Sequence, residues 1–166
     1  MKKKLTFFFT LIILFCLYIF LLSVNYAKSI SANLSSSVFR LHIIANSDSV
    51  EDQQLKLLIR DDIISYMSTL VSTTSTKSDV NRLISDHLED FKNIALETIH
   101  SNGYNYDVNI SIGNFYFPTK SYANVSFPSG YYDALKIEIG EAIGQNWWCV
   151  LFPPLCFVNS SSGVLP

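Results

Sequence analysis

The 166-residue chain carries 12 basic and 14 acidic side chains, so its net charge is −2 and it has no basic stripe that could neutralise phosphates. Nucleic acid is thereby excluded as an expected partner. Aromatic residues make up 14% and charged residues 16% of the chain, a composition that predicts a packed, partly aromatic core and not a disordered chain.

The N-terminal residues 1–28 have the pattern of an export signal. Residues 2–4 are lysines and precede an uncharged apolar run, Leu5 to Leu22, so the lysines are expected to stay in the cytoplasm while the rest of the chain is exported. As a helix this run would reach about 27 Å, which is long for a signal peptide and just sufficient to span a membrane. Ala27 could precede a cleavage point, but Asn25 matches the A-x-A pattern poorly. A cleaved signal peptide and a retained membrane anchor both stay open, whereas a buried core helix would need a polar face that the run lacks.

The segment 29–37 is rich in serine, asparagine and alanine and is expected to be a linker. Residues 38–158 are expected to form a single exported domain, because about 130 residues remain for one core once the N-terminal segment is set aside. Residues 159–166 are expected to be a short tail.

The domain is predicted to open with one strand and two helices. From Val38 to Ala45 apolar residues alternate with Arg40 and His42, which is typical of a half-buried strand. Residues 46–49 can cap a first amphipathic helix, and a second helical pattern runs over 79–99.

The pattern then changes to a period of two, which predicts strands. Gly113 and Asn114 indicate a tight turn between the first two of them. The expected strands are 104–112, 115–117, 132–139 and 147–152. The order β-α-α-β-β-β predicts a two-layer α+β domain, in which two helices cover one face of a largely antiparallel sheet.

Candidates for acid–base catalysis are few. Glu138, Glu141 and His42 are titratable residues in partly aromatic surroundings, but none belongs to a recognisable catalytic motif. The histidines are scattered and no C-x-x-C is present, so neither a metal nor a cofactor is expected. A cell-wall hydrolase is kept as an alternative function of the enzyme class.

The C-terminal segment Gly140 to Phe157 combines glycines, paired tryptophans, paired prolines and two cysteines. In an oxidising compartment, Cys149 and Cys156 are expected to form a disulfide. Such a bridge requires the chain to turn back between them, and Pro153 and Pro154 stand where that turn is needed. The closed loop of eight residues would contribute roughly 2.5 kcal/mol on the chain-entropy model.

Trp147 and Trp148 are adjacent, so in a strand they point to opposite faces and cannot both enter one core. A stapled aromatic turn can simply close a small core. Alternatively, one tryptophan is displayed to a partner, since tryptophan is prominent among binding hot spots. Both interpretations stay open at this point.

Two segments carry a resemblance to a known family. RLHIIANSDSVEDQQLKLLIRD (Arg40 to Asp61) and the segment from Phe117 to Phe157, which contains QNWWCVLFPPLC, resemble the stage II sporulation protein R family of endospore-forming Gram-positive bacteria. The chain departs from the family's usual pattern at Val50, where proline is common, and at Ala123 and Ala142, where glycine is usual; its tail after Cys156 is also short.

The resemblance implies a messenger and not an enzyme. Members of the family are made in the forespore and exported into the space between the two sporulation membranes. There they trigger a membrane-embedded aspartic protease that processes the precursor of the mother-cell sigma-E factor. The resemblance supplies no catalytic residues to carry over.

We therefore predict a secreted or membrane-tethered signalling protein that binds this protease. The segment with Asn146, Trp147 and Trp148 is the first candidate for the binding surface, and the outer strand face with Arg40 and His42 is the second. A cell-wall hydrolase and a structural envelope protein are the alternatives.

Overall fold

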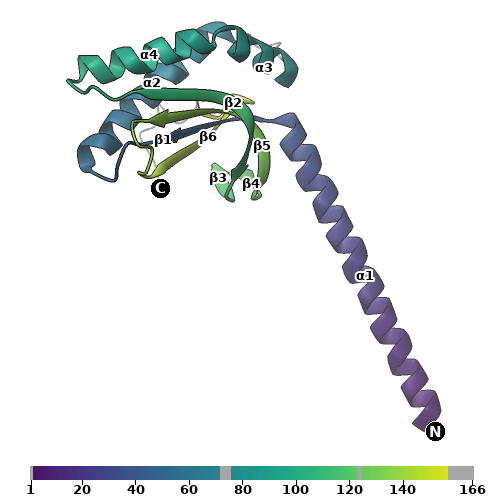
Figure 1. The fold of residues 1–166 in the computed structure, drawn as a ribbon. Helices are drawn as coiled ribbons and strands as arrows, with labels where there is room; N and C mark the ends of the chain where they lie inside the picture. Colours follow the sequence, from purple (N-terminus) through teal and green to yellow (C-terminus); the bar gives the residue numbers. More distant parts are fainter. Residues whose placement is uncertain (1, 72–75, 123–124, 157–166) are drawn as a thin grey trace. The chain divides into compact units, whose positions relative to one another are not determined.

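The computed structural model describes residues 2–71, 76–122 and 125–156, and the chain divides into two compact units, Met1–Leu34 and Ser35–Pro166. The first unit consists of helix α1 (Lys2–Ser37), which continues past the unit boundary (Figure 1). The segment 29–37, expected as a linker, thus lies in this helix.

Helix α1 contains a stretch, Thr6–Tyr26, whose mean hydropathy is 2.8 and of which no part is buried. By length and composition it could cross a membrane, as a signal sequence near the N-terminus also could. Hydroxyl groups in this stretch donate to carbonyls of their own helix: Thr10 Oγ1 to Phe7 O at 2.7 Å and Ser23 Oγ to Ile19 O at 2.9 Å. These bonds satisfy polar groups for which an apolar environment offers no partner.

The second unit is a two-layer α+β domain, as predicted (Figure 1). Its described elements are β1 (Phe39–Ile44), α2 (Val50–Leu70), α3 (Lys77–Asp86), α4 (Leu88–Ser101), β2 (Val108–Phe117), β3 (Lys120–Tyr122), β4 (Val125–Phe127), β5 (Gly130–Ile139) and β6 (Asn146–Phe152).

The main sheet has four strands in the order β2-β5-β1-β6, and β3 pairs with β4 in a separate two-stranded sheet. β2 and β6 each run antiparallel to their neighbour, whereas β1 and β5 are parallel. The prediction of a largely antiparallel sheet is therefore confirmed. The parallel pair arises because the chain crosses over through the helices and β2 before β5 returns beside β1.

Two helices are capped by the residue types that helix starts prefer. Ser49 Oγ accepts a hydrogen bond from the backbone N–H of Asp52 at 3.1 Å at the start of α2. At the start of α3, Thr76 and Asp79 form a reciprocal capping box.

The structure also differs from the expected elements in the second helix and in the strands that follow it: β2 begins at Val108 and not at residue 104, and β3 and β4 were not expected. The single helix expected over 79–99 is divided into α3 and α4 at His87, whose φ and ψ of −110° and 19° are not helical. There His87 Nδ1 lies 2.7 Å from Asp90 Oδ2 and 3.0 Å from the Tyr66 hydroxyl. In addition, Gly113 and Asn114 form no turn but continue β2, which runs unbroken for ten residues.

The core lies between the helices and one face of the sheet. On β1 the inward residues Phe39, Leu41 and Ile43 are completely buried. Helix α2 contributes Ile59 and Ile63 from the other layer, also at zero exposure. Because successive strand residues point to opposite faces of a sheet, the alternate residues of these strands point away from the helices.

Candidate partner-binding face

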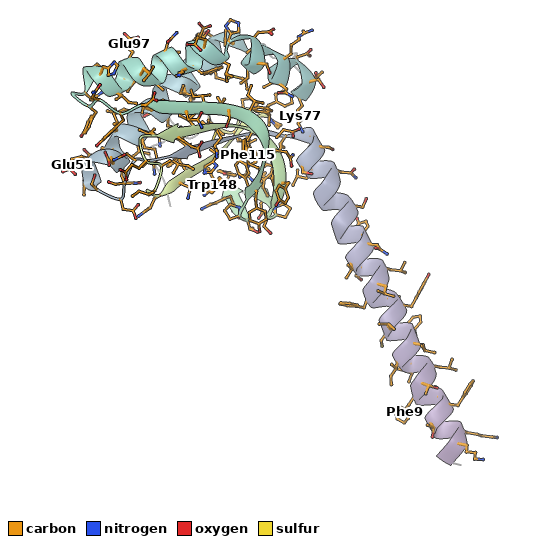
Figure 2. The ribbon with its side chains drawn as sticks, in the orientation of Figure 1. Phe9, Glu51, Lys77, Glu97, Phe115 and Trp148 are labelled. Carbon is orange, nitrogen blue, oxygen red and sulfur yellow. A yellow bond between two sulfur atoms is a disulfide. The ribbon has the colours of Figure 1, made fainter. Side chains whose placement is uncertain are left out.

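The face of the sheet that is turned away from α2 and α4 carries most of the candidate residues. Strand pairing places His42 of β1 between Trp148 of β6 and Lys136 of β5, and Arg40 between Val150 and Ala134. The name Trp148 face is used below for this surface, which consists of Arg40, His42, Phe117, Tyr122, Phe127, Tyr132, Asn146 and Trp148. Figure 2 labels Trp148 and shows the side chains of the surrounding strands.

Arg40 is completely buried in this face, although its place on the outer side of a half-buried strand suggested an accessible charge. Its guanidinium carbon lies 4.1 Å from the centre of the Phe117 ring, 4.8 Å from that of Tyr132 and 5.7 Å from that of Phe127. Ring faces attract cations, and the attraction is larger where water is excluded. Burial nevertheless lowers the pKa of Arg40 below its ordinary value.

The hydrogen bonds of Arg40 are made to neutral oxygens. Its Nε donates to Cys149 O at 3.4 Å and its Nη2 to the Tyr122 hydroxyl at 3.0 Å. Its Nη1 is buried and has no hydrogen-bond partner within the described part of the chain. The guanidinium is therefore held by aromatic rings and neutral acceptors.

The β3–β4 hairpin covers Arg40 and is tied down by Tyr122. The hydroxyl of Tyr122 accepts from Arg40 and donates to the backbone oxygen of Trp148 at 2.9 Å. Burial raises the pKa of Tyr122, although Arg40 acts in the opposite direction. This one hydroxyl thus connects the hairpin with both β1 and β6.

His42 supports Trp148 by stacking. The two ring centres are 3.8 Å apart and the planes are inclined by 22°, while the ring of Phe117 meets Trp148 edge-on at 4.7 Å. His42 Nε2 lies 2.6 Å from Asn146 Oδ1, and because an amide oxygen only accepts, Nε2 is assigned as the protonated nitrogen. The other ring nitrogen, Nδ1, is buried without a partner among the described residues.

The pKa of His42 is lowered from its ordinary value. Burial is the largest cause, and nearby Lys136 and Arg40 add to it, whereas the hydrogen bond to Asn146 and the charge of Glu138 oppose it. A proton on Nδ1 would gain no hydrogen-bond acceptor there. The neutral imidazole is therefore the favoured form in the folded chain.

Trp147 lies on the opposite side of β6 from Trp148, as adjacent strand positions predict. It packs against the core, and the guanidinium carbon of Arg60 on α2 lies 4.4 Å from its ring centre. Its indole nitrogen is buried and has no partner in the described residues. Trp147 therefore belongs to the helix layer, while Asn146 and Trp148 belong to the Trp148 face.

A disulfide joins Cys149 and Cys156, whose Cα atoms are 6.0 Å apart. The chain reverses between them through Pro153, whose backbone oxygen accepts from Leu155 N at 2.7 Å. The bridge holds the segment after β6 against the strand that carries Trp148.

The two segments that carry the family resemblance meet at one end of the sheet, which sequence reasoning did not foresee. Asn46 Oδ1 accepts from Glu141 N at 3.0 Å, and Asp48 Oδ1 accepts from Gln145 N at 2.7 Å. From α2, Lys56 Nζ donates to Gln145 O at 2.8 Å. We call this set of contacts between residues 46–56 and 140–145 the corner.

Asp52 organises the corner from within. Its carboxylate, which is 4% exposed, accepts from Asn46 Nδ2 at 2.8 Å and from Ser47 Oγ at 2.5 Å. Burial alone would raise the pKa of Asp52, but the hydrogen bonds from Ser47 and Asn46 outweigh it and the pKa lies below its ordinary value. The only hint in the sequence was a polar run before α2, which indicated helix caps and not a long-range contact.

Of the residues considered for catalysis, His42 and Glu138 lie near enough for each to affect the pKa of the other, but their hydrogen bonds in the described chain go to other partners. Glu138 is bound to Lys136 at 2.7 Å and to Asn109 at 2.9 Å, and Glu141 is exposed in the corner. Over the described ranges no three His, Cys, Asp or Glu side chains gather in a way that could hold a metal ion. An open hollow of about 500 Å³ between α2 and α4 contains none of the candidates.

The chain is similar to known proteins over most of its length. The family model described as stage II sporulation protein R matches residues 35–162. A protein of Bacillus subtilis strain 168 described as "Stage II sporulation protein R" is 40% identical over 163 residues, which cover 91% of this chain and 73% of that protein. No solved structure matches the chain.

Proposed function

Because the chain belongs to the stage II sporulation protein R family, we propose that it is an exported signalling protein that activates the membrane-embedded aspartic protease processing the sigma-E precursor. The observation that carries this proposal is the family match over residues 35–162. The apolar α1 and the Cys149–Cys156 disulfide support export, because disulfides persist in oxidising compartments. The chain would act in the space between forespore and mother cell, either released or anchored by α1.

Activation of this kind requires binding that distinguishes two states of the protease. A ligand shifts an equilibrium only by binding one state more tightly than the other. The exported unit would therefore bind the active, dimeric state of the protease on its extracytoplasmic side. No covalent chemistry is required of the chain itself.

The Trp148 face is the surface that we assign to this contact. Trp148 is half-buried and Asn146 is exposed, so both present atoms to a partner. A tryptophan whose ring is already held by stacking loses little side-chain freedom on binding, which favours a hot spot. Phe117 and His42 hold that ring from two sides.

Arg40 and His42 contribute to this surface from beneath it. At 0% and 7% exposure they offer a partner almost no area of their own. Arg40 fixes the hairpin through Tyr122, and His42 fixes both Trp148 and Asn146. They are positioning residues in this proposal, while Trp148 and Asn146 make the contact.

The test is reconstitution of precursor cleavage in a host that lacks sporulation genes, with the protease, the precursor and the full chain expressed together. Cleavage should require the chain, and Trp148→Ala should reduce it at least tenfold, since an interface hot spot contributes about 2 kcal/mol or more. Tyr131→Ala, which removes an aromatic ring that is 65% exposed on β5, is the matched control and should leave cleavage unchanged.

The amount of exported protein must be measured for each variant, so that loss of folding is separated from loss of binding. Normal cleavage without the chain would end the proposal. If Trp148→Ala and Tyr131→Ala changed cleavage equally, the proposed function would stand, but the Trp148 face would not be its binding surface. Release of fragments from purified murein by the chain would instead favour a cell-wall hydrolase, and normal processing in a deletion strain would favour a structural envelope protein.

A further inference from the structure

Strand β2 forms one edge of the main sheet, and no other strand of the described chain pairs with its outer side. Within the described residues it pairs only with β5, in ten consecutive positions from Val108 opposite Ile139 to Phe117 opposite Gly130. In an antiparallel pair, alternate residues direct their N–H and C=O groups away from the neighbouring strand. About half of the backbone groups of β2 therefore face outward at this edge.

The devices that usually protect an edge strand are missing from β2. Its sequence, VNISIGNFYF, contains no charged residue and no proline, and its register with β5 shows no bulge. The opposite edge, β6, is short and is followed by Pro153 and the disulfide. An unprotected edge of this length is a template for pairing with another strand.

The first half of β2 is suited to pairing with its own copy. Figure 1 shows that the strand is strongly curved, and Gly113 in its middle is a residue type that accompanies bends. The five residues before it, Val108–Ile112, alternate strictly between branched apolar and small polar side chains. Read from either end, this pattern is the same.

We propose that β2 of one chain pairs antiparallel with β2 of a second copy, with Ile110 on the two-fold axis opposite its own counterpart. Val108 then lies opposite Ile112 on the helix side of the sheet, and Asn109 lies opposite Ser111 on the other side. Because the side-chain period of a strand is two, this register keeps apolar residues opposite apolar ones. The two four-stranded sheets continue into one another.

Burial and charge both favour β2 of a second copy as the strand that pairs with this edge. Ile110 and Ile112 are only partly buried in the single chain, so a second strand would cover their remaining apolar surface. Cross-strand pairs of branched apolar residues stabilise a sheet, whereas like charges directly opposite each other destabilise it. The nearest charges on β5, Lys136 and Glu138, are bound to each other at 2.7 Å. Because β2 itself carries no charged residue, this register places no two like charges of the paired strands directly opposite each other.

Site-specific cross-linking tests this pairing in the full chain. With Cys16→Ser to remove the free cysteine, Ile110→Cys places one thiol on the two-fold axis. Mild oxidation of the protein in detergent micelles should give a disulfide-linked dimer through residue 110, which mass spectrometry of the linked peptide identifies. Ile143→Cys, at a side chain that is 71% exposed in the corner, is the matched control and should cross-link at least tenfold more slowly.

A charge at the edge provides the second arm. Ser111→Lys, added to the Ile110→Cys chain, brings two ammonium groups to either side of the axis and should slow cross-linking on the order of tenfold. Ser78→Lys, which adds the same charge on an exposed position of α3, should have no effect. Thermal melting checks that Ser111→Lys stays folded.

Two results would overturn the proposal. One is a cross-linking rate for Ile110→Cys that is no higher than the rate for Ile143→Cys. This result is also expected if β2 pairs with an extended segment of another protein and not with its own copy. The other is a dimer that forms equally fast with Ser111→Lys in the folded chain. Neither result depends on whether the protein activates a protease, so this inference and the proposed function can fail separately.

Discussion

Replacing Ala142 with glycine should stabilise the folded chain. Ala142 has a φ of 53°, a left-handed conformation that costs a residue with a side chain about 1–2 kcal/mol. The turn is fixed on both sides, because Ala142 N donates to Ile139 O at 3.0 Å and Ile143 N donates to Asn46 O at 3.3 Å. Glycine loses about 0.4–1 kcal/mol more on folding than alanine does. The balance is a gain of about 0.5–1 kcal/mol in the free energy of unfolding.

Urea unfolding followed by tryptophan fluorescence measures this gain. Both tryptophans of the chain lie in β6, so the signal reports the unfolding of the unit Ser35–Pro166 even when α1 is held in micelles. The corner supplies an opposing variant: Gly140 has a φ of 56°, and a Cβ there would lie 2.9 Å from Asn46 Cγ. Gly140→Ala should therefore lose about 2 kcal/mol or more. A midpoint for Ala142→Gly that is unchanged or lower, at unchanged m-value, would refute the reasoning.

Two further predictions concern the residues beneath Trp148. The pKa of His42 is lowered in the folded chain, so the unfolded chain takes up the proton first, and the free energy of unfolding should fall as the pH drops below the ordinary value of 6.5 toward the lowered folded value. His42→Gln should remove this part of the pH dependence in urea unfolding between pH 7.5 and 5, and an identical slope in both proteins would contradict it. Arg40→Ala should lower the free energy of unfolding by about 3 kcal/mol or more, because it leaves a cavity under the hairpin and removes the donor to the Tyr122 hydroxyl. Arg40→Met should cost less than half as much, since it fills the same cage without a buried cation; a loss as large as that of the alanine variant would show that the charge itself is needed.

The local elements of the fold could be read from the sequence because their signals are short-range. Alternation over 38–45 identified β1, and the polar residues ahead of α2 identified its capped start. The division of the second helix at His87 was not readable, because the apolar period continues across it and the break is accompanied by contacts to Tyr66 and Asp90. Gly113 and Asn114 were misread for a related reason: a turn pair was present, but pairing with Ala134 and Asp133 keeps them in a strand.

The sequence predicted on which face of the sheet the candidate residues lie, but not how deeply each is buried. Alternation correctly placed Arg40 and His42 away from the core, and adjacency correctly separated Trp147 from Trp148. That Arg40 would be completely covered could not be foreseen, because the cover comes from a hairpin more than 80 residues away along the chain. Such long-range packing leaves no periodic signal in the sequence of either segment.

The residues in the two segments that resemble the family fall into two groups. Those in the corner are needed for the fold, whereas Asn146 and Trp148 in the Trp148 face remain accessible to a partner. Asn46, Asp52 and Gly140 are accounted for by the fold, since each contributes a buried contact or a backbone conformation that the corner requires. Asn146 and Trp148 retain exposed atoms even though their neighbours hold them rigidly. Ordering a surface side chain costs conformational entropy. For Trp148 this cost is met on folding, so little further entropy is lost when a partner binds its ring. Substitutions in the corner should therefore lower stability and signalling together, whereas substitutions at Asn146 and Trp148 should be able to lower signalling while the domain stays folded.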